Sequence, residues 1–200
     1  MSAFTWPPDD PSVYRSLNLP PPGEEIPAAV LVPLFVAGEE PEPHVVLTRR
    51  RADLRRHAGE ISFPGGRHDV EDADLAETAL REAEEEIGLP RAEVRLLGSL
   101  PRTSTFATNY VIHPYVGTIP AGLRWSASAR EVDAVLELPL AALRAGRTRT
   151  QMQRRGISFQ TDAYIVGDHL VWGATARILD HLLGRLHTTG AGLTLEPSEL

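Results

Sequence analysis

Three glutamates that share one face of a predicted helix constrain this chain more than any other feature. At about 100° of rotation per helical residue, Glu85 and Glu86 fall within roughly 60° of Glu82, whereas Glu84 points nearly the opposite way. Like charges at these spacings repel, and they lie near the helix C-terminus, where the helix dipole also disfavours anions. A hard cation such as Mg²⁺ or Mn²⁺, which prefers carboxylate oxygens, would offset that repulsion. The alternative is an acidic helix face that contacts only water, and the glutamates alone do not decide between the two.

The residues around these glutamates predict how the helix is anchored. Ala83 and Ile87 belong to an adjacent apolar stripe that can pack against a sheet. Gly88 follows the last turn, which is typical of a helix end. Gly65 and Gly66 precede the helix across an acidic loop, and their lack of side chains lets the backbone turn tightly and bring a carbonyl close to a bound group. One side of the helix is thus predicted to fix it in place, and the next side to present acid.

The segment from Arg81 to Leu89 resembles the Nudix box, the signature of hydrolases that cleave a nucleoside diphosphate linked to another group. The Nudix pattern is Gly, five residues, Glu, seven residues, Arg-Glu, an aliphatic residue, any residue, Glu-Glu, any residue, Gly and an aliphatic residue. This chain matches the pattern from Arg81 onward, with Ala83 as a small version of the aliphatic residue. The front half departs from it, because Asp72 replaces the expected glutamate after Gly66 and eight residues separate it from Arg81. The role of Asp72 is therefore open, while the acidic end of the box is complete.

Composition narrows the classes of function. The net charge of −7 argues against a general nucleic-acid-binding protein. The chain has no cysteine, which excludes disulfides, thiolate metal sites and a cysteine nucleophile. The first residues lack the features of a signal peptide, and the longest apolar run, residues 28–37, is too short to span a bilayer. We expect a cytoplasmic protein that acts on a small molecule, without nucleic-acid or membrane partners, and the sequence leaves a homodimer open.

The chain length suits one domain with additional terminal segments. Six prolines predict an irregular arm over residues 1–26, the family resemblance covers roughly residues 27–187, and residues 188–200 are expected to form a frayed tail. The expected strands are 28–36, 44–50, 61–64, 94–100 and 110–119, with a further strand after Glu131 and a late hairpin within 156–166. The first two strands can pair as a hairpin, and Pro33 suggests that the first contains a bulge or lies at an edge.

A second helix is predicted from Trp172 to Gly184, where apolar residues recur at helical spacing. It would cover the side of the sheet opposite the acidic helix and give a helix, sheet, helix sandwich. The predicted fold class is therefore α+β, with a mixed sheet between helices in an α/β/α sandwich. This is also the Nudix fold that the resemblance implies.

Five arginines lie just before the glycine pair in an otherwise acidic protein: Arg49, Arg50, Arg51, Arg55 and Arg56. Guanidinium groups bind phosphate oxygens bidentately, so the cluster suggests a phosphate clamp, although arginines neutralised by carboxylates are the alternative. The segment reads Val46-Leu-Thr-x-Arg50, four residues, Arg55, three residues, Gly59, three residues, Phe63-Pro-Gly-Gly66. It is similar to a motif that precedes the box in coenzyme A pyrophosphatases, which usually has Ser or Ala at Arg51 and Leu at Val46. The resemblance implies that Arg50, Arg55 and Gly59 take part in coenzyme A recognition, with the 3′-phosphate as a candidate target.

Pyrophosphate hydrolysis needs neutralised phosphate charge, an activated water and in-line geometry, and carboxylate-bound divalent ions supply all three. Glu82 and Glu86, about 6 Å apart along the helix axis, are the predicted metal ligands. Glu85 would complete the ligand set, with a carbonyl of the glycine pair assisting. Arg81 cannot act as a base, so we expect it to pair with Glu85 or with an acid of the loop and hold the carboxylates in place. The base is open between Glu82 and Glu85. Glu131 resembles an acid that Nudix proteins place near the site, but the residue alone favours a surface charge.

The resulting hypothesis is a Mg²⁺- or Mn²⁺-dependent pyrophosphatase that converts coenzyme A and its thioesters to 3′,5′-ADP and a 4′-phosphopantetheine product. A Nudix hydrolase for ADP-ribose, a nucleotide sugar or a dinucleoside polyphosphate is the second interpretation. The third is a non-catalytic Nudix module that senses a nucleotide. The complete acidic motif counts against the third, since a sensor has no need of three aligned carboxylates.

Overall fold

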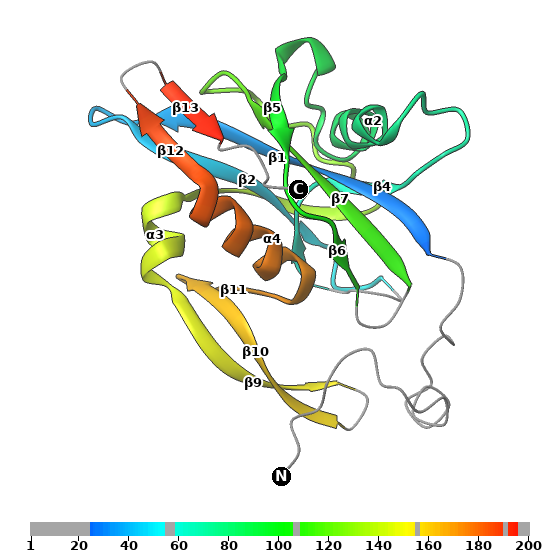
Figure 1. Cartoon of the computed structure of the whole chain (residues 1–200), viewed down its shortest axis with the longest axis vertical. Coiled ribbons are helices and arrows are strands. Elements are labelled where there is room, and N and C mark those ends of the chain that lie inside the picture. Colours follow the sequence, from blue (N-terminus) through cyan, green and yellow to red (C-terminus); the bar gives the residue numbers. More distant parts are fainter. Residues whose placement is uncertain (1–24, 55–58, 106–108, 155–156, 190–191, 196–200) are drawn as a thin grey trace.

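The computed structural model describes residues 25–54, 59–105, 109–154, 157–189 and 192–195 (Figure 1). The strands are β1 (Ile26–Ala37), β2 (Glu42–Arg50), β3 (Ile61–Ser62), β4 (Gly65–Arg67), β5 (Arg95–Ser99), β6 (Thr103–Ser104), β7 (Tyr110–Thr118), β8 (Val132–Pro139), β9 (Arg147–Arg154), β10 (Ile157–Val166), β11 (His169–Trp172), β12 (Leu186–Thr189) and β13 (Gly192–Leu195). The helices are α2 (Leu75–Ile87), α3 (Leu140–Ala145) and α4 (Gly173–Arg185), with a short 3₁₀ turn η1 (Arg91–Glu93). Nearly all of the predicted N-terminal arm lies outside the described residues.

Strand β1 is an interior strand of a mixed, eight-stranded sheet. Along one edge, residues 26–34 pair in parallel with β7. Along the other edge, residues 28–30 pair with β4 and residues 34–37 pair with β2, both antiparallel. The predicted hairpin of β1 and β2 is confirmed, whereas the expectation of an edge strand is wrong. Pro33, which has no N–H to donate, lies between the two segments where the partner strand changes.

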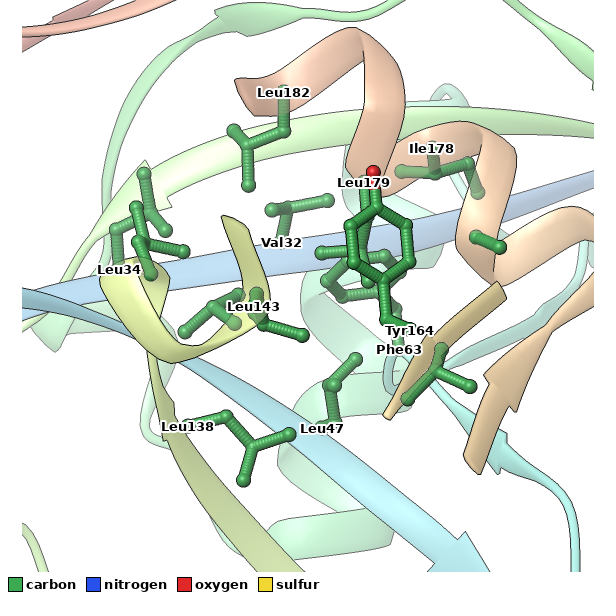
Figure 2. Packing of buried hydrophobic residues seen from close by; sticks show 14 of the residues in the cluster. Val32, Leu34, Leu47, Phe63, Leu138, Leu143, Tyr164, Ile178, Leu179 and Leu182 are labelled. Atoms are coloured by element: carbon green, nitrogen blue, oxygen red, sulfur yellow. The ribbon is translucent and has the colours of Figure 1, made fainter. Parts of the chain in front are cut away.

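The two faces of β1 supply two separate hydrophobic cores. Val32 and Leu34 belong to the core that also contains Leu182 of α4, and Figure 2 shows these side chains in one cluster. Leu31 and Phe35 belong to the other core, which α2 covers. Because successive side chains of a strand point to opposite faces, α2 and α4 must lie on opposite sides of the sheet (Figure 1). The predicted α/β/α sandwich is confirmed.

A smaller three-stranded sheet has the order β11-β10-β9. The prediction of a hairpin within residues 156–166 is wrong, because β10 extends from residue 157 to residue 166 as one strand and pairs with β9 instead. No Gly, Pro or Asn interrupts β10, and the polar sequence of β9 gave no apolar strand signal. Tyr164 of β10 is fully buried in the α4-side core (Figure 2), and its hydroxyl donates to an oxygen of Asp180 at 2.6 Å.

The C-terminal end differs from the expected frayed tail. Helix α4 continues to Arg185, one residue beyond the predicted stop at Gly184. Strands β12 and β13 then pair antiparallel. Among the helices of the described residues, none has the length and apolar character needed to cross a bilayer.

Candidate active site

Helix α2 is capped at both ends by the residues that flank it, Asp74 and Gly88. The side chain of Asp74 accepts a hydrogen bond from the N–H of Glu77 at 2.8 Å. At the other end, Gly88 has a φ of 68°, a left-handed conformation that favours glycine, and its N–H donates to the carbonyl of Glu84 at 3.0 Å. The predicted end of the helix is confirmed. These caps fix the rotation and the last turn of the helix, and hence the direction of its glutamates.

A segment from farther along the chain binds the last carbonyls of α2. The N–H of Ser126 donates to the carbonyl of Ile87 at 3.0 Å, and that of Ser128 donates to the carbonyl of Glu86 at 2.8 Å. These bonds satisfy groups that a helix end otherwise leaves unpaired. The N–H of Glu131 in turn donates to the carbonyl of Ser128 at 3.0 Å. The fold therefore brings Glu131 to the acidic end of α2.

The glutamates of α2 differ in burial along the face that they share. The side chain of Glu86 is only 9% exposed and that of Glu82 is 18% exposed, whereas Glu85 is 61% exposed. Glu84 points elsewhere and accepts a hydrogen bond from Arg91 at 2.8 Å, as the helical geometry predicts. The acid surface therefore has a deep end at Glu82 and Glu86 and a rim at Glu85.

Glu86 is a buried carboxylate with little compensating positive charge. Its Oε2 accepts the N–H of Gly65 at 3.3 Å, and its Oε1 lies 3.8 Å from Nη1 of Arg50. Burial raises the pKa of Glu86 to about 7, and nearby Glu82 and Glu131 also raise it, while the Gly65 N–H and Arg50 lower it. Burial likewise raises the pKa of Glu82, and Glu131 adds to that shift. Glu131 is half exposed, and its carboxylate lies 3.3 Å from Nη1 of Arg50, which also approaches Glu86. It is thus a surface charge near the acidic site, and a direct role in the site stays a prediction.

Arg81 joins the acidic loop to the helix. Its Nε and Nη2 donate to the two oxygens of Asp72 at 2.8 Å and 3.0 Å, while Nη1 donates to Glu82 at 2.9 Å and lies 3.4 Å from Glu85. Asp72 is 4% exposed and also accepts a hydrogen bond from the Thr78 hydroxyl at 2.8 Å. Its hydrogen bonds with Arg81 hold the pKa of the Asp72 carboxyl well below its usual range. The expected pairing of Arg81 is confirmed, and the open role of Asp72 is answered: it anchors the arginine that holds the glutamates.

Both glycines pass close to neighbouring atoms, which are main-chain atoms of β1 at Gly65 and the side chain of Glu82 at Gly66. A Cβ on Gly66 would lie 2.5 Å from the carboxyl carbon of Glu82. A Cβ on Gly65 would lie 2.3 Å from the carbonyl oxygen of Ala29 and 2.6 Å from the Cα of Val30, both in β1. Gly65 thus lets the turn pack directly against the main chain of β1, and Gly66 leaves room for the Glu82 carboxylate.

A model of the NUDIX domain matches residues 25–156, about two thirds of the chain. The chain belongs to the Nudix family. It is 44% identical over 157 residues to proteins named Uncharacterized Nudix hydrolase NudL from Salmonella paratyphi B (strain ATCC BAA-1250 / SPB7) and Salmonella newport (strain SL254). Each match covers 78% of this chain and 80% of the relative. The protein is therefore an enzyme of the Nudix hydrolase class.

Solved structures of Nudix proteins share its fold. A MutT/nudix family protein from Enterococcus faecalis superposes with a TM-score of 0.53 at 15% identity, covering 87% of this chain and 68% of that one. RenU, a Nudix hydrolase from M. smegmatis, has a TM-score of 0.51 at 18% identity, covering 60% of this chain and 74% of that one. At these identities the likeness supports the Nudix fold and leaves the substrate undetermined.

Two of the five clustered arginines of this Nudix hydrolase are neutralised away from the acidic site. Arg49 forms an ion pair with Asp133 at 2.7 Å, and Arg51 forms one with Asp53 at 2.7 Å. For these two, the structure favours carboxylate pairing over a phosphate clamp. Arg50, by contrast, reaches the acidic site, where its Nη1 lies 3.8 Å from an oxygen of Glu86.

Gly59, which was also assigned to coenzyme A recognition, contacts the main chain of Arg50 and not the glutamates of the acidic site. Gly59 donates its N–H to the carbonyl of Arg50 at 3.2 Å. It also lines a cavity of about 360 Å³ on the α4 side of the sheet, together with His169 and Trp172. Arg55 lies outside the described residues, so its role stays a prediction.

Nudix hydrolases generally use divalent metal ions such as Mg²⁺ or Mn²⁺. Among the described residues, no three His, Cys, Asp or Glu side chains form a group arranged to hold a metal ion. Glu82 and Glu86 nevertheless suit a hard cation, because burial raises the pKa of both carboxyls and a cation would supply the missing positive charge. Glu85 suits it least, since it is mostly exposed and drawn to Arg81. The assignment of Glu82, Glu85 and Glu86 as ligands stays a prediction.

Substitution of Gly66 by alanine is expected to impair turnover without unfolding the protein. The new methyl group would displace only the carboxylate end of Glu82, which is flexible, and misplacing a reacting group by about 1 Å can cost on the order of 10²-fold in rate. Steady-state kinetics and thermal unfolding of Gly66→Ala measure the two effects separately. If the effect acts through Glu82, adding Gly66→Ala to Glu82→Gln will lower kcat little further. Unchanged kcat in Gly66→Ala would contradict this role.

Proposed function

We propose that this Nudix hydrolase cleaves the pyrophosphate bond of coenzyme A and its thioesters, giving 3′,5′-ADP and 4′-phosphopantetheine or its acyl form. The supporting observation is the segment before the glycine pair, whose sequence resembles the motif of coenzyme A pyrophosphatases. Arg50 of that segment lies 3.8 Å from Glu86, so the segment adjoins the acidic end of the Nudix box. A substrate whose diphosphate is attacked at Glu82 and Glu86 would therefore contact the segment.

The side chains of the site divide the work of such a reaction. Glu82 and Glu86 would hold Mg²⁺ or Mn²⁺, with Glu85 as the third predicted ligand, and the ion would neutralise phosphate charge and lower the pKa of a water molecule. Arg81, anchored by Asp72, keeps the carboxylate of Glu82 in place. Glu82 and Glu85 remain the predicted bases, and Glu131 joins them as a carboxylate near the same site.

Incubation of the purified protein with coenzyme A and Mg²⁺ or Mn²⁺ is expected to release 3′,5′-ADP and 4′-phosphopantetheine in equal amounts. Chromatography with mass detection identifies both products. Removal of the metal with EDTA is expected to stop the release, and added Mg²⁺ to restore it.

A substrate panel at equal concentrations tests the choice of coenzyme A. Coenzyme A, acetyl coenzyme A, ADP-ribose, a nucleotide sugar and a dinucleoside tetraphosphate are compared by kcat/KM. Coenzyme A or its thioester should give the highest value. A higher kcat/KM for another compound would support the Nudix activity and contradict the choice of coenzyme A as the substrate. Nucleotide binding without metal-dependent hydrolysis of any member would favour a sensor.

A further inference from the structure

The main chain of Arg50 is fixed at a β-bulge beside the acidic site. Between Arg49 and Arg50, the pairing of β2 with β8 steps from Ala134 to Val132. The extra residue of this bulge, Asp133, belongs to β8, so Arg50 keeps a paired position in β2 opposite Val132. The N–H of Arg50 also donates to the carbonyl of Glu60 at 3.0 Å. The direction of the Arg50 side chain is therefore set by the sheet.

Gly59 fixes the carbonyl group of Arg50. Its N–H donates to the Arg50 carbonyl at 3.2 Å, and its φ of 70° lies in the left-handed region that favours glycine. No atom lies within 4 Å of the position of a Cβ on Gly59, so the need for glycine comes from the backbone conformation. The spacing of the two residues in the motif therefore lets Gly59 hold the main chain of Arg50 in position.

The guanidinium of Arg50 is held loosely compared with the neighbouring arginines. Its Nη1 lies 3.3 Å from Glu131 and 3.8 Å from Glu86, whereas Arg49 and Arg81 approach their carboxylates at 2.7 Å and 2.8 Å. Strong charge-assisted pairs have distances of about 2.7–2.9 Å. Within the described part of the chain, the buried Nε of Arg50 has no hydrogen-bond partner. The side chain therefore retains hydrogen-bonding capacity at the place where the acids converge.

We propose that Arg50 binds the oxygens of the diphosphate that is cleaved, and that the 3′-phosphate of coenzyme A is recognised elsewhere. A planar guanidinium can bind phosphate oxygens bidentately, and the two phosphates are the groups that Glu82 and Glu86 must flank for hydrolysis. The ligand class is accordingly any nucleoside diphosphate derivative. The inference rests on the proposed function only for the choice of coenzyme A as the substrate in its test.

The test compares coenzyme A with dephospho-coenzyme A, which has the same diphosphate but lacks the 3′-phosphate. Arg50→Gln is expected to lower kcat/KM by the same factor for both substrates, about 10- to 100-fold, because hydrogen bonds to charged groups are lost. Arg50→Lys keeps the charge and should recover part of the loss. Arg49→Gln, which removes a neighbouring arginine that is paired with Asp133, is the matched control and should stay near wild type. A loss confined to coenzyme A would overturn the inference, because it would identify Arg50 as the reader of the 3′-phosphate.

A binding measurement keeps the inference separate from the identity of the substrate. Calorimetric titration with ADP and Mg²⁺ reports the affinity for a nucleoside diphosphate whether or not coenzyme A is hydrolysed. Arg50→Gln should weaken ADP binding about 10-fold or more, while its thermal unfolding and that of Arg49→Gln confirm that both variants fold. Equal ADP affinity in wild type and Arg50→Gln, or no ADP binding by the wild type, would overturn the inference. If ADP binding behaves as expected but coenzyme A is not hydrolysed, only the proposed substrate is contradicted, and the role of Arg50 stands.

Discussion

Glu86→Gln is expected to lower kcat by about 10³-fold, because a metal ion supplies several kcal/mol of charge stabilisation and each 1.4 kcal/mol is a factor of ten. The amide oxygen of glutamine can still accept the hydrogen bond from the Gly65 N–H. Burial raises the pKa of the Glu86 carboxyl to about 7, so its charged form is unfavourable in the folded protein without a cation. The neutral variant should therefore be at least as stable as the wild type in the absence of metal.

Glu84→Gln is the matched control, since it makes the same change in charge within the same helix turn. Glu84 faces Arg91 and solvent, so its loss should leave kcat near that of the wild type. Kinetics with the substrate from the panel, Mn²⁺ binding and denaturant unfolding give the three readouts. Full turnover in Glu86→Gln would show that this carboxylate is no ligand.

Gly65→Ala is expected to destabilise the fold by about 3 kcal/mol, at the upper end of the cost of overpacking. The added methyl would overlap the carbonyl oxygen of Ala29 and the Cα of Val30, and neither can rotate away because both belong to the main chain of β1. The turn could relieve the overlap only by leaving the sheet, which would also withdraw the N–H that Glu86 accepts. Stability and activity should fall together in this variant, in contrast to Gly66→Ala.

Gly184→Ala is the control, because the same substitution is expected to stabilise the protein at this position instead of destabilising it. Gly184 lies within α4, and nothing occupies the space within 4 Å of the added Cβ. Alanine is favoured over glycine in a helix by up to about 1 kcal/mol, so this variant should be slightly more stable than the wild type. Urea unfolding of the two variants measures the difference. A Gly65→Ala protein as stable as Gly184→Ala would mean that the turn does not rest on β1 as described.

Periodicity and local signals predicted the elements that frame the site. The apolar stripe and Gly88 predicted α2 and its end, and apolar runs predicted β1, β2 and β7. These signals are local, because each depends on residues that are neighbours along one helix or strand. The orientation of Glu82 and Glu86 followed from helical geometry alone.

Contacts between distant segments could not be predicted in the same way. Glu131 lies near the site because Ser126 and Ser128 bind the end of α2 and Arg51 of β2 binds the Glu131 carbonyl, and no pattern around Glu131 indicates these contacts. Asp72 was left open because its loop length departs from the family pattern, yet it is the main partner of Arg81. Arg49 and Arg50 are adjacent and identical in type, and only their contacts in the structure, Arg49 with Asp133 and Arg50 with Glu86, show that one of them reaches the acidic site.

The change of partner along β1 has a consequence for how this enzyme withstands heat and mutation. The turn at Gly65 pairs with β1, which is hydrogen-bonded along both edges, so the carboxylates of Glu82 and Glu86 lie beside a firmly anchored strand. Thermal fluctuations should loosen the peripheral hairpins well before they disturb this support. Substitutions in exposed residues around the site can then change substrate preference while Glu82 and Glu86 keep their positions.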